Sequence, residues 1–207
     1  MLWYNGNFVI SINLLPYLQE YVSSIGSKKR IELLRQYVNP TSNDFILDIG
    51  GNTGRITEAA YSRKGCKEVV VLDPNNKYVV YGRLRRPFIR FIEGGVESIP
   101  LPDEYFDIIV ASFLFHHFRD QDKGLEEMRR VLKPSGKLII FESNPLTRRG
   151  KVLKLIENLF HTCAKLYEPS QLKEMLTNKH NLEVISMDSV SIGYFLVATK
   201  MRKETPP

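Results

Sequence analysis

The chain has 207 residues, which is long enough for one α/β domain with a hydrophobic core and too short for two such domains. Its 43% hydrophobic and 25% charged residues are ordinary for a soluble globular protein, and the sequence contains no internal repeat or low-complexity segment. Lys and Arg outnumber Asp and Glu by 29 to 23, and the resulting charge of +6 fits an anionic substrate, RNA, a membrane surface or a plain basic surface without selecting one.

The first residues predict an apolar arm followed by a helix. Residues 8–18 form an apolar stretch that is too short to span a bilayer and contains Pro16. The stretch also lacks the basic flank and the small-residue cleavage site of a signal peptide, so we expect no integral membrane association. Residues 28–38 place apolar side chains on one face at helical spacing, and Asn39-Pro40 ends that helix, because helical backbone is disfavoured before a proline.

Strands and helices alternate after this helix. Near-continuous apolar runs such as VVVL and IIV are typical of strands that are buried on both faces of a parallel sheet. We therefore predict an α/β fold with a doubly wound, mostly parallel sheet. The expected strands are residues 44–50, 68–73, 88–92, 105–112 and 137–143, and the helical segments between them begin at Thr53, Asn75 and Gln121.

The C-terminal part changes character. Residues 144–171 carry an apolar stripe with a basic cluster near its start, which predicts an amphipathic helical insertion that packs on the domain or covers a substrate. The strand-like runs 181–190 and 192–199 predict an antiparallel pair at the edge of the sheet. We expect one domain over residues 1–207, made of an N-terminal arm or lid (1–27), a core (28–143), the helical insertion (144–171) and a C-terminal helix with strands (172–200).

The two cysteines, Cys66 and Cys163, form no C-x-x-C pair, so neither a zinc site nor a redox motif is predicted. Two free thiols fit a reducing compartment. We expect a cytoplasmic protein.

The segment FILDIGGNTGR, residues 45–55, is the strongest functional signal. A strand that ends in a glycine-rich turn and enters a helix is a frequent nucleotide-binding arrangement. A dinucleotide fingerprint starting at Gly50 would need glycines where the chain has Asn52 and Arg55, and a phosphate-binding P-loop would need a lysine that is missing. The remaining pattern suits a nucleoside ligand with a zwitterionic tail that carries no phosphate.

Several motifs together resemble the class I S-adenosylmethionine-dependent methyltransferases. LDIGGNTG looks like the family's first motif, and VVVLDP ends the second strand in Asp73. The run IEGGVESIPLPDEYFDIIVASFLFHHF resembles the family's third motif and fourth strand, and LEEMRRVLKPSGKLIIFE resembles the helix and strand that close its core. The resemblance covers residues 44–143 and implies a Rossmann-like methyltransferase fold, with S-adenosyl-L-methionine as the cofactor. It is closest to the quinone-biosynthesis methyltransferases.

The resemblance also implies which residues hold the cofactor. The glycine turn lines the methionine part, with Asp48 supporting the turn or the amino group, and Ser112 reaches the same amino-acid moiety. Asp73 accepts the ribose hydroxyls, while Pro74 and the residues from Gly95 to Glu97 flank the adenine. The implied set is Asp48, Gly50, Gly51, Asn52, Gly54, Asp73, Pro74, Gly95, Val96, Glu97 and Ser112.

Two positions depart from the family pattern. Asn52 replaces a commoner glycine, and asparagine tolerates positive φ better than most residues. Gly95 stands where many members carry an aspartate that accepts from the adenine amine, so Glu97 or a main-chain carbonyl is expected to take that hydrogen bond.

Methyl transfer from an activated sulfonium requires orientation and, for some acceptors, a base. The candidates are His117 and His116, directly after the fourth strand, with His117 favoured; the alternative is that one of them caps the strand or packs on the cofactor. An adjacent pair of histidines without a third ligand predicts no metal site.

Four functions remain open at this point. We expect an enzyme (EC 2.1.1.-) that methylates a small molecule by in-line displacement, because Ala111-Ser112-Phe113-Leu114 is not the Asn/Asp-Pro-Pro-aromatic tetrad used on nucleic-acid bases. The basic clusters at 28–30, 83–86 and 148–154 keep an RNA (tRNA or rRNA) methyltransferase as the alternative. A non-catalytic S-adenosylmethionine-binding protein is the third possibility, and a dehydrogenase is disfavoured by Asn52 and Arg55. The sequence leaves the oligomeric state open.

Overall fold

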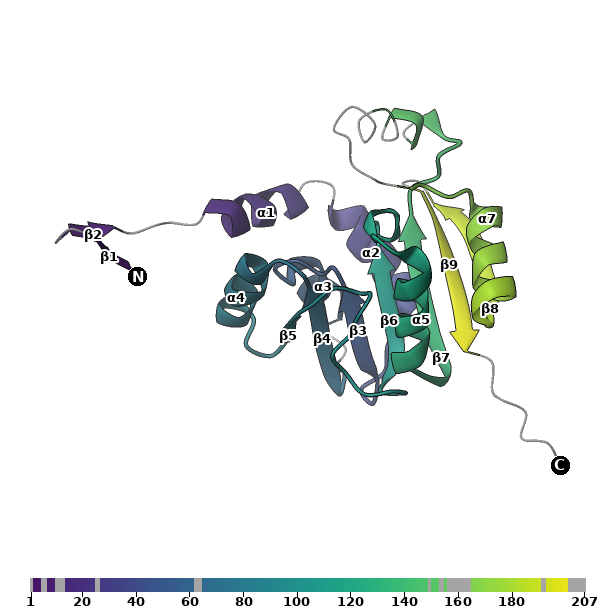
Figure 1. The fold of residues 1–207 in the computed structure, drawn as a ribbon, viewed down its shortest axis with the longest axis horizontal. Coiled ribbons are helices and arrows are strands. Elements are labelled where there is room, and N and C mark those ends of the chain that lie inside the picture. The colour runs from purple at the N-terminus through teal and green to yellow at the C-terminus, as the bar shows by residue number, and fades with distance from the viewer. Residues whose placement is uncertain are drawn as a thin grey trace.

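The structure of the chain is a computed structural model (Figure 1). It describes residues 2–4, 7–9, 14–24, 27–61, 65–148, 150–152, 155, 165–190 and 193–200. Among these residues, no helix combines the length and the apolar character that crossing a bilayer requires.

A seven-stranded mixed sheet forms the centre of the molecule, in the order β5-β4-β3-β6-β7-β9-β8. The first five strands of this order run parallel, and β9 lies antiparallel to both β7 and β8. This arrangement confirms the predicted doubly wound sheet with an antiparallel C-terminal pair at its edge. The strands are β3 (Phe45–Ile49), β4 (Glu68–Asp73), β5 (Arg90–Glu93), β6 (Phe106–Ser112), β7 (Leu132–Glu142), β8 (Leu182–Val190) and β9 (Gly193–Lys200).

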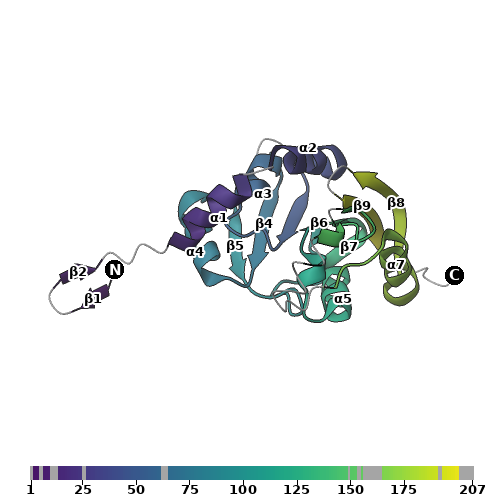
Figure 2. The ribbon, with the colours of Figure 1, turned by 90° about the horizontal axis from the view of Figure 1, so that it is seen from above.

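Helices cover both faces of the sheet (Figure 2). Helices α2, α3 and α4 pack on one face, and α5 and α7 pack on the other. The helical elements are α1 (Leu14–Ser24), α2 (Ser27–Val38), α3 (Arg55–Tyr61), α4 (Asn76–Arg85), the 3₁₀ turn η2 (Phe115–His117), α5 (Gln121–Val131), α7 (Pro169–Glu174) and the π-helical turn η3 (Met175–Lys179). A separate hairpin joins β1 (Leu2–Tyr4) to β2 (Asn7–Val9).

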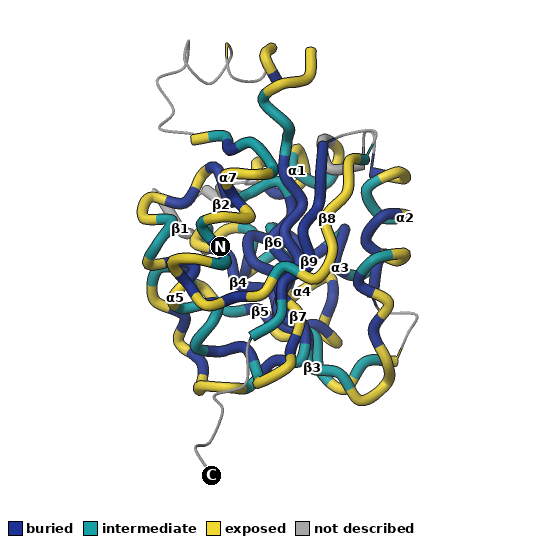
Figure 3. Tube along the Cα trace, turned by 90° about the vertical axis from the view of Figure 1, so that its right-hand side faces the viewer, coloured by how far each residue is buried: buried dark blue, intermediate teal, exposed yellow. Residues whose placement is uncertain are grey.

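Alternation along the strands divides the core into two layers. Leu47 and Ile109 point to the α5 and α7 face, whereas Ile46 and Ile108 point to the α2 and α3 face. Because both faces are covered, the central strands are apolar at nearly every position. In Figure 3 the central strands form the buried centre, and exposed residues lie on the surrounding helices and loops and along the edge strand β8.

Local sequence signals set the helix ends. Asn75 caps α4 by accepting from the backbone N–H of Lys77, and Asp120 caps α5 by accepting from that of Lys123. Of the two acidic residues at the start of α5, Asp120 is therefore the cap, and Asp122 instead pairs with His180.

The structure differs from the sequence prediction in three places. Part of the predicted arm forms α1, because Pro16 lies in the first turn, where its missing N–H costs no helical hydrogen bond. Strand β7 begins at Leu132 rather than at residue 137, because Leu132 pairs with Phe106. Residues 149, 153–154 and 156–164 of the predicted insertion lie outside the described residues; of its described part, residues 148, 150–152, 155 and 169–171 are helical.

The topology indicates at which edge of the sheet a ligand would bind. Strand β3 pairs with β4 on one side and with β6 on the other, so the chain connections reverse direction at β3. In open α/β sheets, ligands bind at the carboxyl ends of the strands beside such a switch point. The carboxyl ends of β3, β4 and β6 are therefore the place to look for a site.

Candidate functional site

The glycine turn follows β3 directly and adopts a left-handed backbone at three positions. Gly50, Asn52 and Gly54 have φ of 64°, 53° and 79°. Asn52 is held in this conformation because its side-chain amide donates to the carbonyl of Gly50 at 2.8 Å. A Cβ at Gly50 would overlap the side chain of Leu114, so glycine is required there by sterics as well as by φ.

Asp73 closes the turn from the end of β4. Its Oδ2 accepts from the backbone N–H of Asn52 at 3.0 Å, and its Oδ1 accepts from that of Asn75 at 2.9 Å. The carboxylate is buried, and burial raises the pKa of Asp73 although the two backbone hydrogen bonds oppose the rise. Each oxygen still has capacity for another donor, such as a ligand hydroxyl.

A charged pocket lies at the other side of the turn. Asp48 is buried and accepts from the Thr57 hydroxyl at 2.6 Å. Burial raises the pKa of Asp48 to about 6, while the Thr57 hydrogen bond and the nearby Arg30 guanidinium act in the opposite direction. Asp48, Arg30, Gly51 and Asn52 all line this small pocket.

Arg30 is a site residue that the sequence analysis missed. It reaches from α2 to the end of β6, where its Nε donates to the Ser112 hydroxyl and its Nη2 donates to the Ser112 carbonyl, both at 2.9 Å. Ser112 thus orients the guanidinium. The nearby Asp48 raises the pKa of Arg30, but desolvation lowers it more, so the pocket combines one half-buried cation with one buried anion.

A larger cavity of about 360 Å³ adjoins the charged pocket, and the two share Gly50. Apolar side chains and main chain form much of its wall. Among the predicted residues, Gly50, Pro74, Gly95, Val96, Glu97 and His117 line it, together with Ile49, Leu72, Gly94, Leu114, Phe118 and Arg119.

Glu97 stands beside Gly95 at this cavity. Its Oε1 accepts from the backbone N–H of Arg119 at 3.0 Å, and a Cβ at Gly95 would lie 3.0 Å from its Oε2. The small residue at position 95 therefore leaves room for the Glu97 carboxylate.

The two histidines have different surroundings. His117 lines the cavity, whereas His116 is buried behind it with its Nδ1 2.7 Å from Glu142 Oε1. The backbone N–H of His116 also donates to Glu142 Oε2 at 3.1 Å. Before them, Phe113 has φ of 54°, a strained value for a bulky residue, and it turns the chain out of β6 into η2. This turn places His117 at the cavity.

Four predicted residues line neither pocket: His116, Gly54, Asp73 and Ser112. Asp73, Gly54 and Ser112 stand behind the lining residues, where Asp73 bonds the turn and Ser112 bonds Arg30. Gly54 allows close approach of the Phe91 ring, because a Cβ there would lie 2.5 Å from that ring.

A buried ionic network fastens α1 to the turn. Arg86 binds both oxygens of Glu20 on α1, at 3.0 and 3.1 Å, and donates to the Thr53 carbonyl at 3.0 Å. It also contacts Glu58 at 2.8 Å, and the Thr53 hydroxyl bonds Glu20 at 2.5 Å. The sequence shows Arg86 only as part of a basic run, so its partners become visible in the fold alone.

Glu20→Ala is expected to release α1 and to lower the free energy of unfolding by about 2 kcal/mol, because a partly buried, charge-assisted pair is lost. Hydrogen exchange of residues 14–24 and denaturant unfolding measure the effect. Glu32→Ala, which removes an exposed pair with Lys29 on α2, is the control and should change stability by less than about 0.5 kcal/mol. Equal effects of the two changes would show that Glu20 does not anchor α1.

A second, wider hollow of about 730 Å³ lies between the end of β7 and α7. Tyr167, which bonds Gln121 at 2.6 Å, and Lys165 contribute to its wall. Among the described residues, no group of three or more His, Cys, Asp or Glu side chains is arranged to hold a metal ion.

Comparisons with known proteins relate the chain to methyltransferases. The family described as "Methyltransferase domain" matches residues 47–140. A ubiquinone/menaquinone biosynthesis C-methyltransferase of Vibrio vulnificus (strain YJ016) is 42% identical over 107 residues, which are 47% of this chain and 40% of that protein. The chain thus matches less than half the length of this relative.

Solved structures share the fold over most of the chain. One is from the "Complex between the Haloferax volcanii Trm112 methyltransferase activator and the putative methyltransferase". That chain is 14% identical to this one and superposes with a TM-score of 0.79. The match covers 95% of this chain and 100% of that chain. Another, described as a possible histamine N-methyltransferase of Thermotoga maritima, is 20% identical with a TM-score of 0.71, covering 90% and 97%.

Proposed function

We propose that the protein is a class I S-adenosylmethionine-dependent methyltransferase that transfers the methyl group of S-adenosylmethionine to a small-molecule acceptor, because residues 47–140 match the methyltransferase family and its relatives share this fold. The observation that carries the proposal is the pair of pockets that meet at Gly50. One pocket holds Asp48 and Arg30, of opposite charge, and the other is larger and has an apolar wall. A ligand with an ammonium and a carboxylate at one end and an aromatic base at the other fits this pair.

In this proposal the cofactor's amino-acid part lies at the charged pocket. Asp48 receives the ammonium group and Arg30, oriented by Ser112, receives the carboxylate. Gly50, Gly51, Asn52 and Gly54 form the turn beneath it. Backbone positions without an obstructing Cβ allow the ligand to approach closely.

The nucleoside part lies at the larger cavity. Asp73, whose oxygens are already held by Asn52 and Asn75, accepts from the ribose hydroxyls. Pro74 and Val96 pack on the adenine. Glu97 accepts from the adenine amine, because this chain has Gly95 where many members of the family carry an aspartate for that hydrogen bond. The sulfonium would then lie near Gly50, at the junction of the two pockets.

The chain's own contribution to the reaction is positioning and proton transfer. When bound, the cofactor supplies an activated methyl group for in-line displacement. We propose that His117 takes the proton from the acceptor, because its side chain lines the cavity. His116 holds η2 in place through its two contacts with Glu142.

We propose a quinone-like ring as the acceptor and cytoplasm as the location. The matched Vibrio vulnificus protein is described as a C-methyltransferase of quinone biosynthesis. RNA is less well supported, because Arg30 and Arg86, from two of the basic clusters that favoured it, form internal contacts with Ser112 and Glu20. Residues 1–207 act in this proposal as one methyltransferase domain.

A protein partner is a further part of the proposal. The Haloferax volcanii chain with the same fold was solved with a methyltransferase activator. We propose that this chain also works with an activating protein.

Calorimetry tests the cofactor, and Asp73→Ala tests its placement. S-adenosylmethionine should bind more tightly than NAD or NADP. Asp73→Ala should weaken that binding by about 1–3 kcal/mol, because the ribose loses a charged acceptor and Asn52 loses its restraint. Asp103→Ala, an exposed carboxylate paired with Arg130 away from the pockets, is the control. Unchanged affinity in Asp73→Ala would refute the ribose assignment, and tighter nicotinamide binding would refute the cofactor.

The acceptor is tested by methyl transfer from labelled cofactor to a panel of reduced benzoquinones and naphthoquinones, with bulk tRNA as the competing class. Incorporation into a ring acceptor supports the proposal. Incorporation into tRNA alone would replace it with the RNA function.

A further inference from the structure

Helix α1 turns its polar side chains toward the domain and its apolar side chains away from it. Gln19 lines the charged pocket and Glu20 belongs to the buried ionic network, so both point inward. At 100° per residue, Leu15, Leu18 and Tyr21 lie on the opposite face. Their exposed fractions are 39%, 58% and 67%. A surface helix normally buries its apolar face, so the outer face of α1 is suited to contact with an apolar partner.

A second exposed face of a related kind follows β7. Four exposed residues of this helical segment fall within about 100° of one another around its axis: Arg148, Lys151, Val152 and Leu155. The two apolar side chains among them are 57% and 59% exposed. Gly150 is buried on the opposite face, where a Cβ would overlap the Asn144 carbonyl. The face turned to solvent therefore combines cations with apolar side chains.

Both faces lie at the edge of the sheet that carries the two pockets. Helix α1 is fastened to Thr53, which follows β3, and the second segment follows the carboxyl end of β7. In Figures 1 and 2 both stand above the carboxyl ends of the parallel strands. A broad, flat partner can therefore contact both at once.

These two parts of the chain expose positive charge and no carboxylate of their own. In residues 1–31 the only acidic residue is Glu20, whose carboxylate lies in the buried ionic network. Residues 143–155 contain four cations and no acidic residue. Exposed carboxylates at this edge, such as Glu93 and Asp120, belong to the end of β5 and to the cap of α5.

We propose that these two faces bind the molecule reversibly to an anionic lipid surface. We call them together the apolar–basic surface: the outer face of α1, formed by Leu15, Leu18 and Tyr21, and the exposed face formed by residues 148, 151, 152 and 155. Helices that lie in a membrane interface combine apolar side chains, which enter the acyl boundary, with Lys and Arg, which reach the anionic headgroups. The contact is peripheral, because no described helix can cross a bilayer.

The side chains favour lipid over RNA, the other common polyanion. The ring of Tyr21 suits the headgroup level of a membrane, where tyrosine is enriched. RNA would neutralise Arg148 and Lys151, but its bases stack on aromatic rings and leave Leu18 and Leu155 without apolar contact. The inference concerns a surface outside the two pockets and does not depend on methyl transfer.

Flotation of the purified full chain with lipid vesicles tests the proposal. We expect the chain to float with vesicles of equal parts phosphatidylglycerol and phosphatidylcholine. With phosphatidylcholine alone, binding should fall by about tenfold or more, because each cation near an anionic surface contributes about fivefold. Absence of flotation, or equal flotation with both vesicles, would overturn the proposal.

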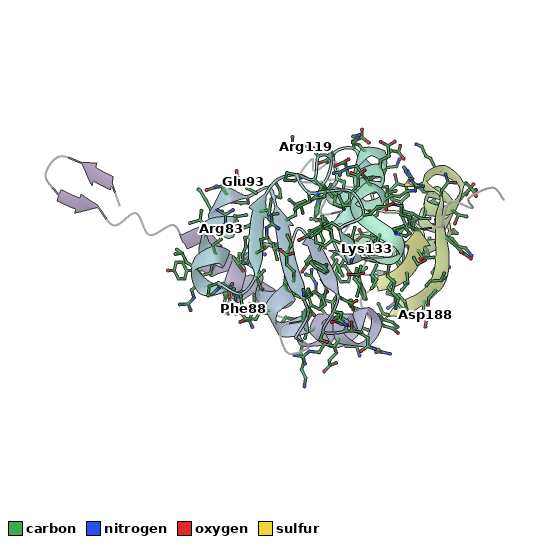
Figure 4. All side chains as sticks on the ribbon, turned by 90° about the horizontal axis from the view of Figure 1, so that it is seen from below. Arg83, Phe88, Glu93, Arg119, Lys133 and Asp188 are labelled. Carbon is green, nitrogen blue, oxygen red and sulfur yellow. The ribbon has the colours of Figure 1, made fainter. Side chains whose placement is uncertain are left out.

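Charge and apolar variants locate the contact. Leu18→Asp and Lys151→Glu should each weaken binding to the anionic vesicles by about fivefold or more. Ile185→Asp, at a 54% exposed position of β8, is the control for the first change and should leave binding unchanged. Lys137→Glu is the control for the second; Lys137 is exposed near the amino ends of the strands, on the strand that carries Lys133 in Figure 4.

Two outcomes of this series would refute the surface. Equal losses in Lys151→Glu and Lys137→Glu would show that net charge alone drives binding. A loss in Lys151→Glu without one in Leu18→Asp would show a purely ionic contact that does not involve the apolar face of α1.

A photo-crosslinking residue identifies the occupant in the cell. With p-benzoylphenylalanine at Leu18 or Leu155 of the full chain in its native cells, we expect adducts with lipid, and none at the control position Ile185. A discrete adduct with a protein or with a second copy of the chain, or no adduct, would overturn the proposal. Leu18→Asp should bind S-adenosylmethionine as the wild type does, so a wild type that floats without binding this cofactor would refute only the methyltransferase proposal.

Discussion

His117→Ala is expected to lower kcat for methyl transfer by about 100-fold or more, since general bases contribute about 10²–10⁴-fold. The reason is its position: η2 presents His117 to the cavity beside Leu114, and Gly50 is at the same wall. The affinity for S-adenosylmethionine should change little, because the proposed cofactor contacts come from α2 and from residues at or after the ends of β3, β4 and β5. Initial rates with the ring acceptor and calorimetry with the cofactor separate the two effects.

Two comparisons distinguish base chemistry from cavity shape. Added imidazole should restore part of the rate of His117→Ala, because it can enter the space left by the side chain and accept the proton. Arg119→Ala, which also alters the cavity wall, should show no imidazole rescue. A His117→Ala enzyme that keeps more than a tenth of the wild-type kcat would contradict the base role, and the reaction would then depend on positioning alone.

The sheet could be predicted from the sequence because its signals are local. Apolar runs ended by Gly, Asp or Pro mark β3 and β4 within one or two residues of their observed bounds. The start of β7 at Leu132 depends on pairing with Phe106, which is a contact between distant parts of the chain. Helix α1 was missed because Pro16 and the apolar run around it carry no distinct helical signal, and its position is stabilised by Glu20 through Arg86.

The site could be predicted only in part, because some of its residues are brought together by contacts between distant parts of the chain. Residues at the carboxyl ends of β3 and β4, such as Gly50 and Asp73, can be found by their place at the end of a strand. Arg30 lies far from them in sequence, and nothing in the run Lys28–Arg30 distinguishes the cation that turns inward from its exposed neighbours. The buried polar partner of Arg30 is Ser112, whose hydroxyl accepts from the guanidinium; the predicted contact of Ser112 with the amino-acid part of the cofactor stays a prediction.

The burial of Asp48 beside Arg30 affects the free energy of unfolding. A carboxylate buried at the end of β3 is more costly to ionise in the fold than in the unfolded chain, even with Thr57 and Arg30 nearby. The proposed ammonium group of the ligand would lie beside Asp48 and would compensate for the free-energy cost of ionising this carboxylate in the fold. Such strain at a site is expected when a residue serves binding rather than folding.

Asp48→Asn should therefore stabilise the protein without ligand and weaken its binding of S-adenosylmethionine. Because burial raises the pKa of Asp48 to about 6, the ionised form is disfavoured by folding. The Asp48 contribution to stability is most favourable below about pH 4 and is lost as the pH rises to about 6, a loss of about 3 kcal/mol. The asparagine variant keeps an acceptor for Thr57 and stays neutral, so its stability should lack this fall and exceed that of the wild type at pH 7.

Cofactor binding should show the opposite trend. The ionised carboxylate binds the ammonium group, so wild-type affinity should decline below about pH 6, whereas the affinity of Asp48→Asn should be lower at pH 7.5 and depend less on pH. Denaturant unfolding and calorimetry between pH 4 and pH 8 measure both quantities, and the difference between the two proteins removes the contributions that they share. Parallel stability profiles would show that Asp48 carries no such cost. Equal affinities at pH 7.5 would show that the ammonium group lies elsewhere, and Arg30 would then bind the cofactor's carboxylate without a counterpart across the pocket.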